Sequence, residues 1–330
     1  MPAYLSTRNE VATDSLFDIQ LLPNTVLAAG NLNNLRTRNL ARGVYINAAS
    51  SPLLDEEDAP GVRLRWIAPA GLGNPFASSF GARVIGILGM PLWEQFSPLE
   101  AVTISVWGNR TPSDPDPVLL GTVRPYRLRG IDGPSPLLTS SFLTPSRVNR
   151  FVVVPEELVA AYGSIDVRVH YVNYNGLPPH NGCYIGGIWV GNAVVIPDGV
   201  EAQFSITTEP GATPVISRGG QSYMDADPPV RSVEYAIGNL DERQCWGSGV
   251  SDGFGNGGIR LQPEWWSDIQ RRVSTGSPCI CIPRTREVPG ALEKFWLLNT
   301  AMYGRLSRPI NIEHQAGPYY RASWGVVEER

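Results

Sequence analysis

A mostly apolar run extends from Ile185 to Ile196, between glycines and Pro197, and it predicts one buried strand or a pair of them. After the turn dipeptide Asp198-Gly199, the pattern changes to strict alternation of apolar and polar residues. Phe204 and Ile206 then share one face of a half-buried strand, and polar side chains lie on the other face. We therefore expect one sheet to end and another to begin at this point of the chain.

Short strand patterns recur at close intervals before this point. They cover residues 43–51, 62–69, 81–90, 101–108, 119–126, 150–158 and 165–175. The last of them alternates most cleanly, with Ile165, Val167, Val169 and Tyr171 on one face and Asp166, Arg168 and His170 on the other. Many short strands, separated by turn signals and with few helices between them, predict a β-sandwich.

The C-terminal part predicts further strands and one short helix. The strands are expected over residues 231–237, 279–283 and 301–330. The helix is expected over 263–272, where Pro263 occupies the first turn. Trp265 and Trp266 cannot both face the same side of that helix, so we expect at least one of them to be exposed or to press on a partner.

Composition supports an all-β fold. The chain has 330 residues, enough for two domains with a core in each. Its 34 glycines and 29 prolines, with only 18% charged residues, favour short strands and turns over long helices. We predict two β-sandwich or jelly-roll-type domains with long loops and one or two short helices. The expected division is an N-terminal arm over 1–42, a β-sandwich over 43–196 and a β-rich domain over 197–330.

Charge and hydropathy narrow the partner classes. The net charge of −4 provides no global basic field, so nucleic acid is not an expected partner. The sequence has no apolar run of membrane-spanning length and no signal peptide at its start, so we expect a soluble protein without a membrane span, made in a cytoplasm. Lys294 is the only lysine. Codon bias in a GC-rich genome is our preferred explanation for the excess of arginine, and bidentate pairing with carboxylates at subunit interfaces is the functional alternative.

The four cysteines are Cys183, Cys245, Cys279 and Cys281. Their spacing matches no zinc-ribbon or ferredoxin pattern, although Cys279 and Cys281 would share a strand face. Our first interpretation is that they are small buried hydrophobic residues in a reducing compartment. A zinc or iron–sulfur site formed by all four is the alternative. The prediction is no metal and no cofactor.

The sequence carries no catalytic fingerprint, and we predict that the protein is not an enzyme. Its three histidines, His170, His180 and His314, form no paired metal-binding motif. There is no nucleophile elbow and no dinucleotide-binding motif. The glycine-rich segment 247–258 lacks the lysine ending of a phosphate-binding loop, and the acidic run Asp55–Asp58 lacks the alternating spacing of a calcium loop.

Several segments together resemble distal-tail and tail-tip proteins of long-tailed bacteriophages. They are the apolar run 185–196, the alternating strand after it, SRGGQSY at 217–223, the arginine-bearing strand 231–237, and a closing strand that ends in two glutamates. In the N-terminal half, the order of the ASS segment at 49–51, the acidic run, Arg65-Trp66, the strand 82–89 and TISVWGN at 103–109 resembles a galactose-binding-like (discoidin-type) jelly roll.

The resemblance implies a structural virion protein of the tail tip or baseplate, assembled in the host cytoplasm. It would form a ring of three or six copies and link the tail tube to the tip or to fibres, with tube, hub and fibre proteins as partners. The interface candidates are Trp265, Trp266, Arg231 and Tyr320. The alternative is a carbohydrate-binding adhesin that recognises host surface sugars through Trp93, Trp107 and Tyr174. A glycan-cleaving tail enzyme is a third hypothesis.

Overall fold

The structure is a computed structural model that describes residues 3–12, 17–49, 59–66, 83–91, 100–111, 113–123, 147–154, 162–173, 182–196, 202–216, 222–246, 266–283 and 300–329. It is mostly β-structure with short helical segments, which confirms the all-β prediction. The strands form four sheets. We name them sheet A (β13-β1-β16-β17-β18-β15-β14), sheet B (β2-β5-β10-β7-β8), sheet C (β11-β4-β3) and sheet D (β12-β6-β9).

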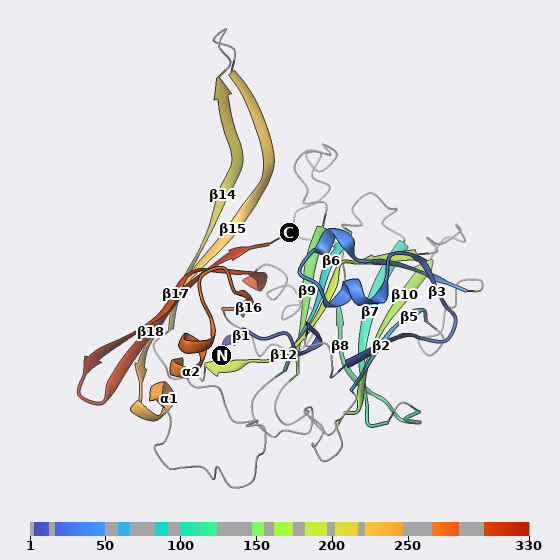
Figure 1. Ribbon diagram of the computed structural model, residues 1–330, viewed down its shortest axis with the longest axis horizontal. Coiled ribbons are helices and arrows are strands. Elements are labelled where there is room, and N and C mark those ends of the chain that lie inside the picture. Colours follow the sequence, from blue (N-terminus) through green and yellow to red (C-terminus); the bar gives the residue numbers. More distant parts are fainter. Residues whose placement is uncertain are drawn as a thin grey trace.

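Sheets B, C and D make up the N-terminal half (Figure 1). Sheet B contains β2 (Phe17–Leu21), β5 (Gly61–Trp66), β7 (Glu100–Asn109), β8 (Val118–Val123) and β10 (Ser164–Asn173). Sheet C contains β3 (Thr25–Ala29), β4 (Val44–Ala48) and β11 (Gly182–Ile185). Sheet D contains β6 (Arg83–Pro91), β9 (Arg147–Val154) and β12 (Gly187–Asn192). Three short 3-10 helices, η1 (Glu10–Ala12), η2 (Leu32–Arg36) and η3 (Leu40–Arg42), lie between the early strands.

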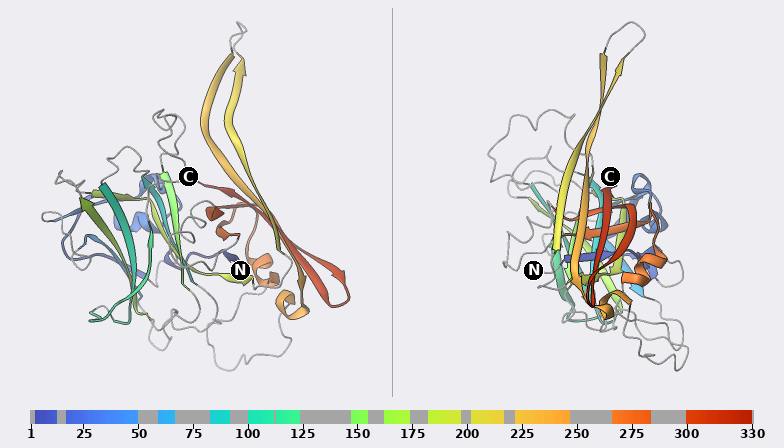
Figure 2. Two further views of the ribbon diagram at one scale, coloured as in Figure 1. Left: turned by 180° about the vertical axis from the view of Figure 1, so that it is seen from behind. Right: turned by 90° about the vertical axis from the view of Figure 1, so that its left-hand side faces the viewer.

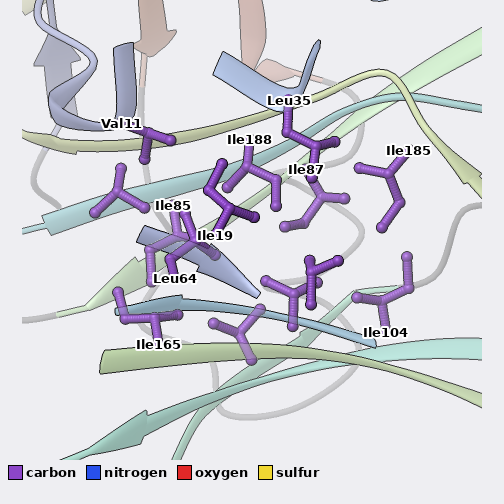
Figure 3. Packing of buried hydrophobic residues seen from close by; sticks show 14 of the residues in the cluster. Val11, Ile19, Leu35, Leu64, Ile85, Ile87, Ile104, Ile165, Ile185 and Ile188 are labelled. Carbon is purple, nitrogen blue, oxygen red and sulfur yellow. The ribbon is translucent and has the colours of Figure 1, made fainter. Parts of the chain in front are cut away.

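Sheet B packs face to face against sheets C and D, and the space between them is filled by aliphatic side chains (Figure 3). Ile165, Val167 and Val169 of β10 point into this core, as the alternation predicts. Asp166 and His170 are buried on the opposite face of the same strand. The predicted β-sandwich is therefore confirmed, and the face of sheet B that points away from the core carries these polar side chains.

Sheet A makes up the C-terminal half. It contains β1 (Ala3–Ser6), β13 (Val194–Ile196), β14 (Ala202–Ile216), β15 (Ser222–Leu240), β16 (Pro278–Ile282), β17 (Met302–Ala316) and β18 (Tyr319–Glu328). Two helices, α1 (Glu242–Trp246) and α2 (Trp266–Arg272), contribute Cys245, Trp266 and Ile269 to the core on one face of the sheet. The predicted short helix thus forms over Trp266–Arg272, and 263–265 lie outside the described residues.

A third core joins the two halves. On the other face of sheet A, Tyr4, Ile280 and Tyr303 pack against Trp189 and Phe151 of sheet D. Sheet D therefore buries both of its faces, and so does β16, whose cysteines and isoleucines point to opposite cores. Strands buried on both faces have continuous apolar sequences, which explains the runs in β6, β12 and β16.

The apolar run 185–196 crosses between the two halves. It is divided among β11, β12 and β13, which belong to sheets C, D and A respectively. One sheet thus ends and another begins inside the run, between β12 and β13, and not at the Asp198-Gly199 turn where the change was expected, because β13 and β14 belong to the same sheet. The predicted boundaries between segments 1–42, 43–196 and 197–330 stay predictions. Strand pairing nevertheless shows that the predicted N-terminal segment 1–42 contributes strands to the sheets: β1 pairs with β13 and β16, and β2 pairs with β5.

Candidate functional site

The most prominent feature of the molecule is a long ribbon formed by β14 and β15, which projects from the body (Figures 1 and 2). The two strands pair from Ala202–Ile237 to Ile216–Ser222. In the described structure, β18 accompanies β15 only from Ser232 to Leu240. The half of β15 from Ser222 to Arg231 pairs with β14 alone, and it reaches roughly 30 Å at about 3.3 Å per residue. We call this two-stranded part the arm.

Among the described residues, both strands of the arm have an open edge, and β14 is the last strand of sheet A over its whole length. The ladder shifts register between Glu209 and Gly211, next to Pro210 and opposite Pro228-Pro229. Proline lacks the N–H that a central strand needs, so three prolines are tolerated where each strand has a single neighbour. A two-stranded ribbon is marginally stable alone in water, and open edges are templates for pairing with another chain.

An aromatic row fixes the root of the arm to the body. Phe204, Tyr235 and Trp324 are cross-strand neighbours on β14, β15 and β18. Their rings stack, with centroids 5.9 Å apart for Phe204–Tyr235 and 4.7 Å for Tyr235–Trp324. Trp266 of α2 stacks on the other end of the row, 4.8 Å from Trp324. The Tyr235 hydroxyl donates to the Pro283 carbonyl at 2.9 Å, so the row is held by a hydrogen bond as well as by packing.

Charged groups hold the root at the point where β18 ends. The Arg231 guanidinium binds both carboxylate oxygens of Glu328, one of them at 2.9 Å from Nε. Arg150 of sheet D lies near this pair. Burial lowers the pKa of Arg150 to about 9, the Arg231 charge adds to this lowering, and Glu328 opposes it. The Arg231–Glu328 pair therefore ties the arm root to the end of β18.

The interface residues predicted from the sequence fall in different environments. Trp266 is only 3% exposed and belongs to the core of its own chain, so its proposed place in a subunit contact is corrected. The cause is the stacking of its ring on Trp324. Arg231 is half-buried and paired within the chain. Trp265 lies outside the described residues, as does the segment 247–258.

Tyr320, the remaining interface candidate, contributes to an exposed aromatic patch near the end of the β17–β18 hairpin. Its ring makes edge contacts with Trp246 at 5.8 Å and with His314 at 5.3 Å. Trp246 is 45% exposed and Tyr319 is 48% exposed. These two are among the few large hydrophobic side chains that the described surface leaves open.

The aromatics expected to face a glycan are described only in part. Trp93 and Tyr174 lie outside the described residues. Trp107 is half-buried on the outer face of sheet B, where its indole N–H donates to the Ser105 hydroxyl at 2.8 Å. The Arg168 guanidinium lies 5.4 Å from its ring centroid and occupies a ring face that a sugar would use. The role of Trp107 in sugar binding stays a prediction.

Polar side chains on this outer face form a connected network around Asp166. Its buried carboxylate accepts hydrogen bonds from Arg63 at 2.5 and 2.7 Å and from Arg168 at 3.1 Å. The hydrogen bond to Asp166 raises the pKa of Arg63, while burial opposes that rise. Beside it, the Ser105 hydroxyl and the His170 ring nitrogen are 2.6 Å apart and buried. Since the serine also accepts from Trp107, the pair is part of a packed network.

The four cysteines are free thiols and all are buried. Cys279 and Cys281 share one face of β16 as expected, in the same core as Cys245. Cys183 lies in the sandwich core instead, so the alternative of one site formed by all four is not supported. Among the described residues, no group of three or more histidine, cysteine or acidic side chains is placed to hold a metal ion. His180 and Asp55–Asp58 are outside those residues.

The fold and the arm together define a class: an all-β protein whose two halves share a central core and which projects a two-stranded ribbon. Comparison with known proteins adds no family to this class. No protein-family model matches the chain, and no curated protein matches it either. Neither described helix is long or apolar enough to cross a membrane.

Proposed function

We propose that this protein is a structural component of the tail tip or baseplate of a long-tailed phage. In this proposal, it forms an oligomeric ring and links the tail tube to the tip or to fibres. The observation that carries the proposal is the β14–β15 arm, because a ribbon with two open edges suits assembly with neighbouring chains. The phage assignment itself rests on the sequence resemblance.

The edge of β14 nearest the body is the contact we propose between copies. Ser205 and Thr207 are exposed there, and Phe204 and Ile206 are half-buried. A neighbouring strand along this edge would receive backbone hydrogen bonds and would cover the two half-buried apolar side chains. Closed ring symmetry would satisfy each edge once and would stop further polymerisation.

The stoichiometry of the purified protein tests this proposal. We expect a closed oligomer by native mass and by negative-stain imaging. The variant Ser205→Lys/Thr207→Lys puts two positive charges on the proposed edge, and charge on an edge strand opposes pairing. Its oligomer should dissociate. The matched control is Thr111→Lys/Ser113→Lys, which places the same substitutions in an exposed loop of the N-terminal half. It should assemble normally.

Two results would overturn the proposal. A wild-type protein that stays monomeric at all concentrations would refute self-assembly. Equal assembly of the edge variant and its control would show that the β14 edge is not the contact between copies. The phage assignment is tested separately, since antibodies raised against the protein should label the distal end of the tail in purified virions. Labelling elsewhere, or none, would refute it. A monomer that binds host glycans would favour the adhesin.

A further inference from the structure

A pocket of about 290 Å³ lies at the seam between the sandwich and sheet A. Segments far apart in the sequence line it, namely the stretch around η1, the end of η2, β12, the turn after α2, and β17. The position is notable because the two halves meet here, next to the core they share. The volume is at the lower end of the range for small-molecule sites, which corresponds to a ligand of about monosaccharide size.

Arginine dominates the charge of this pocket. Arg8, Arg36, Arg38 and Arg272 all line it, and none of the described lining residues is acidic. The chain as a whole carries a net charge of −4, so the pocket departs from the overall balance. The nearby carboxylate of Glu10 is paired with Arg8 at 3.3 Å.

Two of these arginines are held in place by hydrogen bonds within the chain. Arg36 donates to the backbone carbonyls of Val11, at 3.2 Å, and of Phe17. Arg272 donates to the Thr7 hydroxyl at 3.1 Å. These bonds orient the two guanidinium groups at the wall of the pocket. An oriented guanidinium is the preferred protein group for bidentate binding of phosphate or carboxylate.

Polar and aromatic groups complete the wall. Asn9 is fixed by two hydrogen bonds to β12, as donor to the Ile188 carbonyl at 3.0 Å and as acceptor from the Val190 amide at 3.1 Å. Trp189 and Tyr303 meet edge to face with centroids 6.0 Å apart and form part of the lining. Burial and the Glu329 carboxylate raise the pKa of Tyr303, and the Arg38 charge opposes that rise.

We propose that the seam pocket binds a compact organic oxyanion, a small molecule or a terminal sugar unit that carries a phosphate or a carboxylate. The arginines bind the anionic group, and the ring edges and hydroxyls of the wall contact the remainder of the ligand. The inference goes beyond the proposed assembly function and does not depend on it, because the pocket lies within one chain.

Calorimetric titration of the full chain with three probes tests the inference: inorganic phosphate, glycerol 3-phosphate and glucuronate. Binding of both phosphates alone would identify a phosphate site, binding of glucuronate alone a carboxylate site, and binding of all three the shared oxyanion chemistry. Affinity should fall at high salt, since exposed charges are screened. The diagnostic variant is Arg38→Ala/Arg272→Ala, which removes two of the lining charges. Arg36 is left intact because it holds backbone carbonyls.

We expect the diagnostic variant to bind at least about tenfold more weakly than the wild type, the effect of losing a hydrogen bond to a charged group. The matched control is Arg65→Ala/Arg321→Ala, two exposed arginines outside the pocket, and its affinity should be unchanged. Thermal unfolding without ligand would verify that both variants are folded. Equal weakening in both variants would indicate nonspecific charge attraction and would overturn the proposal. So would no binding of any probe by the wild type.

Discussion

Replacement of Trp266 by alanine distinguishes the core position of this residue from the interface role expected of it. The ring is 3% exposed and stacks on Trp324 at 4.8 Å. Truncation of a buried tryptophan to alanine costs about 3–5 kcal/mol, because apolar contacts are lost and a cavity remains. With an unfolding entropy of about 2.1 cal/mol/K per residue, a cooperative chain of 330 residues should lose about 4–7 °C in Tm.

A double-mutant cycle isolates the ring contact itself. Trp266→Ala and Trp324→Ala should show a coupling of about 0.5–1.5 kcal/mol in urea unfolding, the range for stacked aromatic pairs. The control cycle joins Trp266→Ala to Trp189→Ala, since Trp189 lies in the core on the opposite face of sheet A. That cycle should be additive within about 0.5 kcal/mol. A Trp266→Ala protein with wild-type stability that fails to assemble would refute the core assignment and restore the interface hypothesis.

Three further predictions concern the sandwich, the β17–β18 pair and the thiols. Asp166→Asn removes a buried carboxylate that two arginines bind. The free energy of unfolding, measured by urea titration, should therefore fall by roughly 3–5 kcal/mol. A change below about 1 kcal/mol would show that the ion pairs of Asp166 do not stabilise the sandwich. Gly304→Ala places a methyl group 2.0 Å from the Val327 carbonyl oxygen of the neighbouring strand. Tm should therefore drop by an amount equivalent to about 1–3 kcal/mol. An unchanged Tm would show that β17 and β18 can move apart there without loss of stability. Burial raises the pKa of Cys183 and of Cys281 to about 12 from the ordinary 9.0, so the unfolded chain ionises first. The contribution of these thiols to stability should therefore be constant below pH 9 and decline from there towards pH 12. Denaturant titrations across this range would measure the decline, and a chain with both cysteines replaced by alanine should show less of it.

The sandwich was predictable because its strands carry local signals. The alternation of β10 assigns each side chain to the core or to the polar face, and period-two patterning allows only one such register. The continuous apolar sequences of β16 and of 185–196 likewise predict strands that are buried on both faces. The all-β fold class follows from these patterns together with the many glycines and prolines.

The arm was not predictable, because its sequence lacks those signals. Pro210 and Pro228-Pro229 break the strand pattern, yet a ribbon with open edges accepts them. The orientation of Trp266 depends on Trp324, which is distant in the sequence, so helical periodicity alone could not decide it. The seam pocket combines Arg36 and Arg38, in a stretch without a clear period, with Arg272 from the far end of the chain. Only the packing of the two halves brings these charges together.

The arm and the pocket are both connected to the contact between sheet A and the sandwich. The aromatic row and the Arg231–Glu328 pair connect the arm root to sheet A, and the opposite face of that sheet shares a core with sheet D. A neighbouring subunit that engages the arm would therefore act on a unit whose halves are joined by buried side chains. An anion bound at the seam would contact both halves and would stabilise their association by RT ln(1 + [L]/Kd), since the site exists only while they are packed together. The ligand would then hold the two halves of the chain in the relative position from which the arm projects.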